Sequence, residues 1–360
     1  MNILIVTPIF PPRVGGPATY VWDLASRLKK KHSVTIICFS QNPEEFPGIM
    51  LIGVSPAGGM LKRQVRLLIE LLKNVKNTDI VYIQGPLVIG LSSAIAAKLL
   101  GKRALLKFVG DEAWENARIA GTIDSNLEDF FARSNPAYLE FQRLAQKIAL
   151  QLADKIITPS KYLKSFLTEQ YQLPRKKITV IPNAVEVKTQ AQKKDPTKLV
   201  FVGRMVPWKN IDAIIKAVEL ARKKEKWTLT IIGEGPEEKK LKKMVKKLKA
   251  GKWVHFAGRL SKEDTLRHIA MAKKLILYSA YEGLSHTIIE AMFLGTEVIA
   301  SDIEANRETT EGHATLVPLA DLRRLADAIN ARQADVEEAR HFAADRYTWQ
   351  RHLEQLEKIL

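Results

Sequence analysis

Short apolar runs that end in glycine or proline recur along the whole chain, and they constrain its fold more than any other feature. Residues 199–203 read LVFVG, residues 228–236 read TLTIIGEGP and residues 253–259 read WVHFAGR. Apolar runs of this length that stop at a tight-turn residue are typical of buried strands, and helical patterns lie between them. Strands that alternate with helices predict an α/β fold built on parallel sheets.

The length of the chain requires more than one such sheet. Its 360 residues exceed one typical domain, and both halves show the same alternation, so we expect two doubly wound, Rossmann-like domains that face each other. Residues 186–198 are polar, rich in lysine and free of apolar periodicity, which is typical of a linker. We therefore place the domains at residues 1–185 and 199–344, and a last helix at residues 345–360.

Two glutamates, Glu282 and Glu290, lie eight positions apart where a strand is expected to turn into a helix. Residues 274–278 (KLILY) and 296–301 (TEVIAS) are expected to form strands, with a helix over residues 285–294 between them. On one helix the two carboxylates would be about 12 Å apart, nearly the reach from a ribose to a sugar across a diphosphate. The alternative is that both are ordinary surface charges.

The start of this helix is a predicted anion site. Leu284, Ser285, His286 and Thr287 stand there, and the free amides of a first helical turn, with the positive end of the helix dipole, favour phosphate. We therefore assign these four residues to donor binding.

Two cations follow the strand at residues 199–203. Arg204 and Lys209 lie on one loop, which Gly203 opens with a tight turn. An arginine fork and a lysine point charge can clasp a diphosphate and stabilise the charge that develops as it leaves. Gly233 ends the next strand in the same way. The alternative is two solvated loop cations.

The N-terminal strand is followed by a second glycine turn. Residues 1–10 (MNILIVTPIF) are expected to form a buried strand, and Gly15 and Gly16 then lead into a helix. Adjacent glycines let bare backbone approach a phosphate, although they do not complete the dinucleotide-binding fingerprint. The alternative is a tight turn without a ligand.

These segments, together with residues 153–160 (ADKIITPS) and 178–184 (ITVIPNA), resemble the retaining glycosyltransferases of family four, which have the two-domain GT-B architecture. The resemblance spans nearly the whole chain. It implies a nucleoside-diphosphate sugar as co-substrate, no resident cofactor and a last helix that crosses back onto the N-terminal domain.

The resemblance also implies roles for single residues. Arg204 and Lys209 would clamp the diphosphate, and the backbone at Gly16 would approach it from the N-terminal domain. Glu290 would receive the ribose hydroxyls and Glu282 the hydroxyls of the donor sugar. No Asp-x-Asp motif is present, so the two cations would stand in for a metal ion at the leaving group.

One segment departs from the family. Many relatives have a histidine after the strand that corresponds to residues 104–109, and this chain has Gly110 and Asp111 there instead. Asp111 could align a sugar or acceptor hydroxyl, with Trp114 offering an aromatic face, or it could cap the helix that follows. We place Asp111 in the site and keep the cap as the alternative.

The chain is strongly basic, with a net charge of +17 and a pI near 9.7. Residues 60–76 are expected to form a basic amphipathic helix, which could rest on anionic lipid near a lipid-linked acceptor or pack on its own sheet. Lysine-rich residues 239–252 are interpreted as a solvated helix face, because no aromatic residue stands between Lys239 and Lys249. Specific nucleic-acid binding is therefore not expected.

The single cysteine, Cys38, and the absence of a secretory signal at the N-terminus are consistent with a reducing cytoplasm, with the inner membrane face as a possible place of association. Residues 80–97 are uncharged, but Gln84, Gly85 and Pro86 divide them, so we expect a strand and a buried helix rather than a membrane span.

The function predicted from these features is the transfer of a hexose-type sugar from a nucleoside-diphosphate donor to a hydroxyl of a sugar, glycan or lipid-linked acceptor. In the mechanism that the resemblance implies, the anomeric configuration is retained and the leaving phosphate takes the acceptor proton. The alternatives are a nucleotide-sugar epimerase or a sugar phosphorylase on the same fold, and a non-catalytic scaffold that binds polyanions. The donor base and the oligomeric state are not determined by the sequence.

Overall fold

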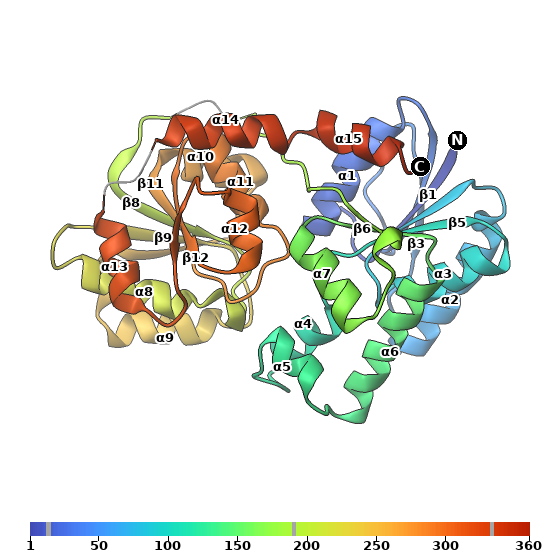
Figure 1. Cartoon of the computed structure of the whole chain (residues 1–360), viewed down its shortest axis with the longest axis horizontal. Coiled ribbons are helices and arrows are strands. Elements are labelled where there is room, and N and C mark those ends of the chain that lie inside the picture. The colour runs from blue at the N-terminus through green and yellow to red at the C-terminus, as the bar shows by residue number, and fades with distance from the viewer. Residues whose placement is uncertain (12–15, 189–191, 332–334) are drawn as a thin grey trace.

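The computed structural model describes residues 1–360 except 12–15, 189–191 and 332–334. The chain forms two α/β domains that lie side by side, with the first half of the chain in one and the second half in the other (Figure 1).

The N-terminal domain is built on a seven-stranded parallel sheet in the order β3-β2-β1-β4-β5-β6-β7. Its strands are β1 (Asn2–Thr7), β2 (Ser33–Phe39), β3 (Met50–Val54), β4 (Ile80–Gln84), β5 (Arg103–Lys107), β6 (Lys155–Thr158) and β7 (Ile178–Val180). Its helices are α1 (Gly16–Leu28), α2 (Gly59–Val75), α3 (Gly90–Leu99), α4 (Glu112–Ile119), α5 (Leu127–Ala132), α6 (Ala137–Leu152), α7 (Lys161–Gln170) and the short η1 (Arg175–Lys177).

The C-terminal domain is built on a six-stranded parallel sheet in the order β10-β9-β8-β11-β12-β13. Its strands are β8 (Asp195–Val202), β9 (Thr228–Ile232), β10 (Val254–Gly258), β11 (Ala272–Leu277), β12 (Glu297–Ser301) and β13 (Thr315–Val317). Its helices are η2 (Pro207–Lys209), α8 (Ile211–Ala221), α9 (Glu238–Lys247), η3 (Ala250–Lys252), α10 (Lys262–Met271), α11 (His286–Phe293), α12 (Glu304–Thr310) and α13 (Leu322–Asn330), followed by α14 (Val336–Arg346) and α15 (Trp349–Glu357).

Both sheets reverse their strand order beside their first strand. The reversal lies between β1 and β4 in one sheet and between β8 and β11 in the other. At such a point the loops from neighbouring strands diverge and leave a crevice at the carboxyl edge of the sheet, where ligands bind in folds of this kind. The expected pair of doubly wound parallel sheets is confirmed, and each sheet has one natural ligand position.

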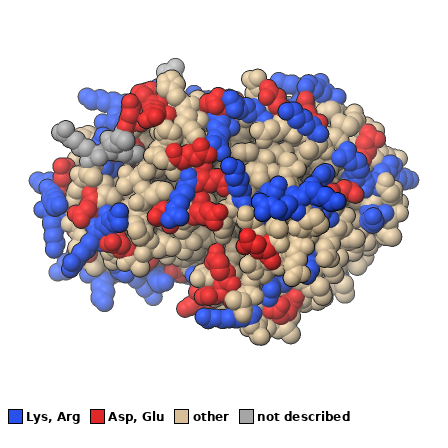
Figure 2. Space-filling view, in the orientation of Figure 1, with Lys and Arg blue, Asp and Glu red and all other residues tan. Residues whose placement is uncertain are grey.

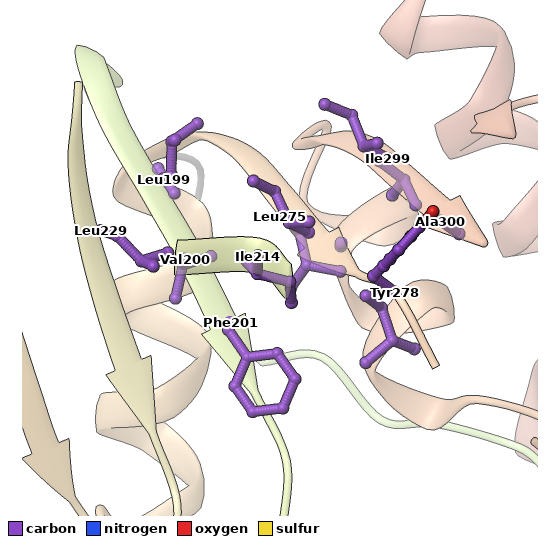
Figure 3. Close-up of a cluster of buried hydrophobic side chains, with 14 of the residues drawn as sticks. Leu199, Val200, Phe201, Ile214, Leu229, Leu275, Tyr278, Ile299 and Ala300 are labelled. Atoms are coloured by element: carbon purple, nitrogen blue, oxygen red, sulfur yellow. The ribbon is translucent and has the colours of Figure 1, made fainter. Parts of the chain in front are cut away.

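The core of the C-terminal domain shows why its strands are almost wholly apolar. Leu199, Val200 and Phe201 are consecutive in β8 and all have an exposed fraction of 0%. Successive side chains of a strand point to opposite faces, so both faces of this sheet are covered by helices. Figure 3 shows Val200 between the neighbouring strands, with Ile214 of α8 close to it.

The last two helices join the domains. Helix α14 lies on the C-terminal domain, and α15 crosses to the N-terminal domain, where the chain ends (Figure 1). The ring of Trp349 stacks on Tyr20 of α1 with 5.6 Å between centroids, and the Tyr20 hydroxyl hydrogen-bonds His352 Nε2 at 2.8 Å. Leu356 is fully buried in the same apolar cluster.

One boundary of the sheet differs from the expected position, and one uncharged segment has the expected structure. Strand β8 begins at Asp195, inside the expected linker, because Asp195 pairs with Ala272 of β11. The uncharged residues 80–97 form β4 and most of α3, as expected. Among the described residues, no helix is both long and apolar enough to cross a membrane.

We expect Trp349→Ala to lower the free energy of unfolding by about 3–5 kcal/mol, because it removes a large ring that is 7% exposed from the interface between α15 and α1. Urea unfolding followed by circular dichroism measures this. Gln350→Ala, an exposed neighbour on the same helix, is the control. Equal stability of the two variants would show that α15 does not hold the N-terminal domain.

Candidate active site

A cavity of about 280 Å³ lies between the two domains, at the carboxyl ends of both sheets. The N-terminal domain lines it with residues that include Gly16, Tyr20, Gln84, Lys107, Glu115 and Asn183. The C-terminal domain contributes residues that include Arg204, Trp208, Lys209, Tyr281, Glu282, Leu284 and His286. Each sheet therefore presents its crevice to the same space.

The glycines after β8 and β9 position the loop that carries Arg204 and Lys209, which we call the cation loop. Gly203 and Gly233 have φ angles of 159° and 128°. A Cβ on Gly233 would lie 2.0 Å from the carbonyl oxygen of Gly203, which no side chain tolerates. Neither glycine lines the cavity. Their role is to let the two loops pack closely, so that the β8 loop can turn toward the cleft.

Lys209 and Glu282 form the central ion pair of the cavity, with 2.5 Å between Nζ and Oε1. Only 15% and 10% of their side chains are exposed, so the pair lies away from bulk water. The loops that carry them are tied together by a hydrogen bond of 2.7 Å from the Ala280 amide to the Trp208 carbonyl. Arg204 lines the same wall and has no ion pair with another described residue.

Helix α11 starts at this wall, as the sequence indicates. The Ser285 hydroxyl caps it by accepting a hydrogen bond from the Ile288 amide, and Gly295, with a φ of 60°, follows its end. Leu284 and His286 line the cavity, whereas Thr287 does not. Burial, with the nearby Lys262 and Lys107 charges, lowers the pKa of His286 to about 3, so its imidazole is neutral at physiological pH.

Glu290 occupies a different environment from Glu282. It is 4% exposed, pairs with Lys262 of α10 and is not among the residues that line the cavity. Burial raises the pKa of Glu290, and the Lys262 ammonium opposes that shift. Because Lys262 is 48% exposed, this lysine has room to move away from the carboxylate.

Asp111 has the contacts of a helix cap. It is fully buried and accepts hydrogen bonds from the Trp114 amide at 2.9 Å, the Tyr171 hydroxyl at 2.6 Å and Gln146 Nε2 at 3.2 Å. It does not line the cavity. These three donors account for its carboxylate, so the capping alternative describes its place in this structure. Trp114 is 1% exposed and packs on Trp208 and Tyr281, which leaves no open face for a sugar.

Glu115 of α4 lines the cavity and was not predicted as a site residue from the sequence. It stands one helical turn after Asp111, a spacing that could have identified it. Burial, together with the charges of Glu112 and Asp111, raises the pKa of Glu115 to about 8. Gly15 lies outside the described residues, and Gly16 lines the cavity.

Among the described residues, no group of three or more histidine, cysteine, aspartate or glutamate side chains is arranged to hold a metal ion. The site is therefore described by its cations, its carboxylates and the N-terminus of α11.

Family models match both halves of the chain. Residues 14–189 match the model of Glycosyltransferase Family 4, and residues 184–349 match that of Glycosyl transferases group 1. This chain belongs to the family 4, group 1 glycosyltransferases. The resemblance inferred from the loops is thus confirmed, and the cavity is the candidate active site of a glycosyltransferase.

Curated relatives agree with the family. An uncharacterized glycosyltransferase of Methanocaldococcus jannaschii is 27% identical over 61% of this chain and 61% of its own length. The first relatives thus match over less than two thirds of their length. A GDP-mannose-dependent phosphatidylinositol monomannoside mannosyltransferase of Mycolicibacterium smegmatis is 23% identical over 99% of this chain and 98% of its own.

Solved structures show the same GT-B fold. Anabaena HepE in complex with UDP and glucose has a TM-score of 0.78 at 18% identity, over 100% of this chain and 99% of its own. Sucrose-phosphate synthase from Thermosynechococcus elongatus has a TM-score of 0.79 at 18% identity, over 99% of this chain and 98% of its own.

The raised pKa of Glu115 predicts a pH dependence of stability. Between its ordinary value of 4.5 and about 8, the folded chain keeps a proton that the unfolded chain has released. The contribution of protonated Glu115 to the free energy of unfolding is therefore present at low pH and is lost as the pH rises through that range. We expect Glu115→Gln to flatten the slope of unfolding free energy against pH between those values.

Urea unfolding at a series of pH values measures this slope. Glu219→Gln, at an exposed position of α8, is the control and is expected to keep the wild-type slope. A Glu115→Gln variant with an unchanged slope would contradict the burial of a protonated carboxyl at this wall.

Proposed function

We propose that this enzyme transfers a hexose-type sugar from a nucleoside-diphosphate donor to an acceptor hydroxyl, with retention of configuration and without a bound metal. The observation that carries the proposal is the pair of cations, Arg204 and Lys209, in a cavity that both domains line. Both cations come from the loop after β8, at the point where the strand order reverses, as expected for a phosphate site in such a sheet.

In this proposal the diphosphate lies against Arg204 and Lys209. Lys209 is ion-paired with Glu282, and both side chains are largely shielded from water. Its ammonium group is therefore already positioned before a ligand binds. Charges that are preorganised in this way stabilise a leaving diphosphate without further rearrangement. The oxygen lone pairs of Glu282 that do not bind Lys209 can still accept hydrogen bonds from hydroxyls of the donor sugar.

Glu290 is proposed to receive the ribose hydroxyls. Its support is its place in the first turns of α11, where its charge partner is the half-exposed Lys262. A ribose that donates two hydroxyl hydrogen bonds would take over the carboxylate as Lys262 moves toward solvent. This exchange keeps a buried carboxylate satisfied throughout, which burial requires.

The reaction breaks the bond between the sugar anomeric carbon and the phosphate oxygen and forms a bond to the acceptor oxygen on the same face. The acceptor proton passes to the departing phosphate oxygen, so that no protein base is consumed. Support comes from the two carboxylates that line the cavity. Glu282 is paired with Lys209, and the pKa of Glu115 is raised to about 8, so neither resembles a free nucleophile.

The basic charge of the chain does not favour a polyanion scaffold. At the start of α9, Lys240 pairs with Glu237 at 2.7 Å and Lys242 with Glu238 at 2.6 Å, so part of its positive charge is neutralised locally. Figure 2 shows acidic groups gathered along the middle of one face, where they interrupt the basic groups that spread over both domains. A continuous basic track, which single-stranded nucleic acid requires, is therefore not present on this face.

We expect one nucleoside diphosphate, among UDP, GDP and ADP, to raise the melting temperature in the presence of a chelator, because a ligand bound only by the folded state stabilises it. In Glu290→Ala the affinity for that nucleotide should fall by about tenfold or more. In Lys209→Ala the release of nucleoside diphosphate from the sugar conjugate should fall by about 100-fold or more.

Thermal shift and single-turnover assays measure these effects, with Lys216→Ala, a half-exposed lysine of α8, as the control. Wild-type binding and turnover in both site variants would contradict the site. Turnover that appears only after magnesium or manganese is added would contradict the metal-free mechanism.

We further propose that the N-terminal domain rests on anionic lipid near its acceptor. Helix α2 leaves apolar side chains uncovered: Leu61, Val65 and Ile69 are 77%, 50% and 47% exposed. Basic side chains interleave with them, among them Lys62 and Arg66. An apolar helix face with interleaved cations is suited to the interface of an anionic bilayer.

A second helix of this domain also leaves apolar side chains uncovered. Helix α6 packs on α3, as α2 does, and its Tyr138, Phe141 and Leu144 are 49%, 63% and 53% exposed. Aromatic side chains of this kind are suited to the headgroup level of a membrane.

We expect the wild-type protein to float with vesicles that contain phosphatidylglycerol and to stay behind with pure phosphatidylcholine. The double variant Leu61→Ser, Val65→Ser should lose most of this flotation, because it removes the apolar face and keeps the charge. Leu99→Ser, which is 72% exposed on α3, serves as the matched control. Equal flotation of the double variant and the control would contradict the proposal.

A further inference from the structure

The N-terminal wall of the cavity contains a cluster of polar side chains to which neither the family resemblance nor the sequence analysis assigns a role. Gln84 ends β4 and Lys107 ends β5, and the two residues are directly paired in the parallel register. Paired residues of neighbouring strands point to the same face, so their side chains leave the sheet together. Asn183, which follows β7, lines the cavity with them.

Lys107 is a buried amine without a hydrogen-bond partner among the described residues. It is 1% exposed, its Nζ is shielded from solvent, and no described residue accepts a hydrogen bond from it. Buried lysines in proteins are almost always paired. Two carboxylates line the cavity, Glu282 and Glu115. Glu282 is ion-paired with Lys209, and burial raises the pKa of Glu115 to about 8, so neither offers Lys107 a free negative charge. The burial of Lys107 lowers the pKa of its ammonium well below the usual range.

The Lys107 amine is positioned by the Tyr20 ring. Lys107 Nζ lies 3.2 Å from the centroid of the Tyr20 ring, a cation–π arrangement. The Tyr20 hydroxyl is in turn fixed by Tyr82 at 3.0 Å and by His352 of α15 at 2.8 Å. The aromatic ring covers one side of the amine, so a ligand oxygen must reach it from the cavity.

Two side-chain carbonyl oxygens of the cluster also lack partners. Gln84 Oε1 and Asn183 Oδ1 are buried and accept no hydrogen bond from a described residue. Their residues are 4% and 6% exposed. Carbonyl oxygens accept from hydroxyls and cannot serve an anion, so they require a different part of a ligand from the part that Lys107 requires.

We propose that Lys107, Gln84 and Asn183 form an acceptor subsite, and that the acceptor is a polyhydroxyl compound with a phosphate or carboxylate group. The anionic oxygens bind Lys107, and neighbouring hydroxyls donate to Gln84 and Asn183. This inference rests on the proposed function, in which the C-terminal domain holds the donor and the N-terminal domain holds the acceptor. It adds the chemical class of the acceptor.

The anion could also come from the donor, since a nucleoside diphosphate is itself anionic. The position of the cluster favours the acceptor. Arg204 and Lys209 already supply two cations from the opposite domain, whereas the unpaired carbonyl oxygens of Gln84 and Asn183 belong to the same wall as Lys107. In the proposed function the hydroxyls of the donor are already bound by Glu282 and Glu290, so a separate ligand has to supply the hydroxyls for these oxygens.

The test measures the binding of matched pairs of probes by calorimetry, with and without a saturating nucleoside diphosphate. The pairs are glucose and glucose 6-phosphate, galactose and galacturonate, and inositol and inositol 1-phosphate, with inorganic phosphate as the simplest anion. The proteins are the wild type, Lys107→Met and the control Lys98→Met, whose lysine is exposed on α3. Lys107→Met fills the same volume without the buried amine, so we expect it to fold at least as well as the wild type.

We expect at least one charged probe to bind about tenfold or more tightly than its neutral partner, and this preference to vanish in Lys107→Met but not in Lys98→Met. The affinity for the nucleotide alone should change by less than about twofold.

The proposal is overturned if the wild type shows no preference for charged probes, or if the preference survives in Lys107→Met. A loss of nucleotide affinity in Lys107→Met would also overturn it, and would assign the lysine to the donor diphosphate. Failure of the proposed function is a different result, because the wild type would then bind no nucleotide at all.

Discussion

The ion pair between Lys209 and Glu282 is the interaction on which the candidate site depends. It joins the loop after β8 to the loop after β11, the two strands between which the C-terminal sheet reverses its order. A backbone hydrogen bond from Ala280 to Trp208 reinforces the same junction. With these loops fixed to each other, the start of α11 and the cation loop face one cavity, and the proposed diphosphate site is preorganised before a ligand binds.

The N-terminal domain completes the cavity because α15 returns to it. Trp349 and His352 of that helix contact Tyr20, and Tyr20 supports Lys107 at the cavity wall. The crossing helix therefore has two effects. It connects the domains mechanically, and it fixes the ring that covers a buried amine. A movement of α15 would therefore shift Tyr20, and with it the surroundings of Lys107 in the proposed acceptor subsite.

Much of this architecture follows from local sequence patterns. The strands of both sheets are apolar runs, Ser285 caps α11 through its own hydroxyl, and Gly295 follows the end of that helix in the left-handed region. Each of these features depends on residues that are close to one another in the sequence. For that reason they could be predicted without knowledge of the fold.

The contacts that the sequence alone could not show join residues that are distant in the sequence. Asp111 looked like a site residue, but its carboxylate is occupied by Gln146 and Tyr171, which are 35 and 60 positions away. Glu290 is paired with Lys262 of another helix. Lys107 lies within the strand expected at residues 104–109, and only the sheet register places it beside Gln84. The sequence therefore predicted which loops face the cleft, and the tertiary contacts decide which side chains are free in it.

The most direct test of the central claim is hydrogen exchange with and without the nucleotide sugar that the protein binds. If that ligand lies in the cleft, amides in residues 203–210 and 281–288 should be protected, and so should amides after β4 and β5 on the opposite domain. Protection confined to the lysine-rich helix α9, or to one domain alone, would contradict a site that both domains build.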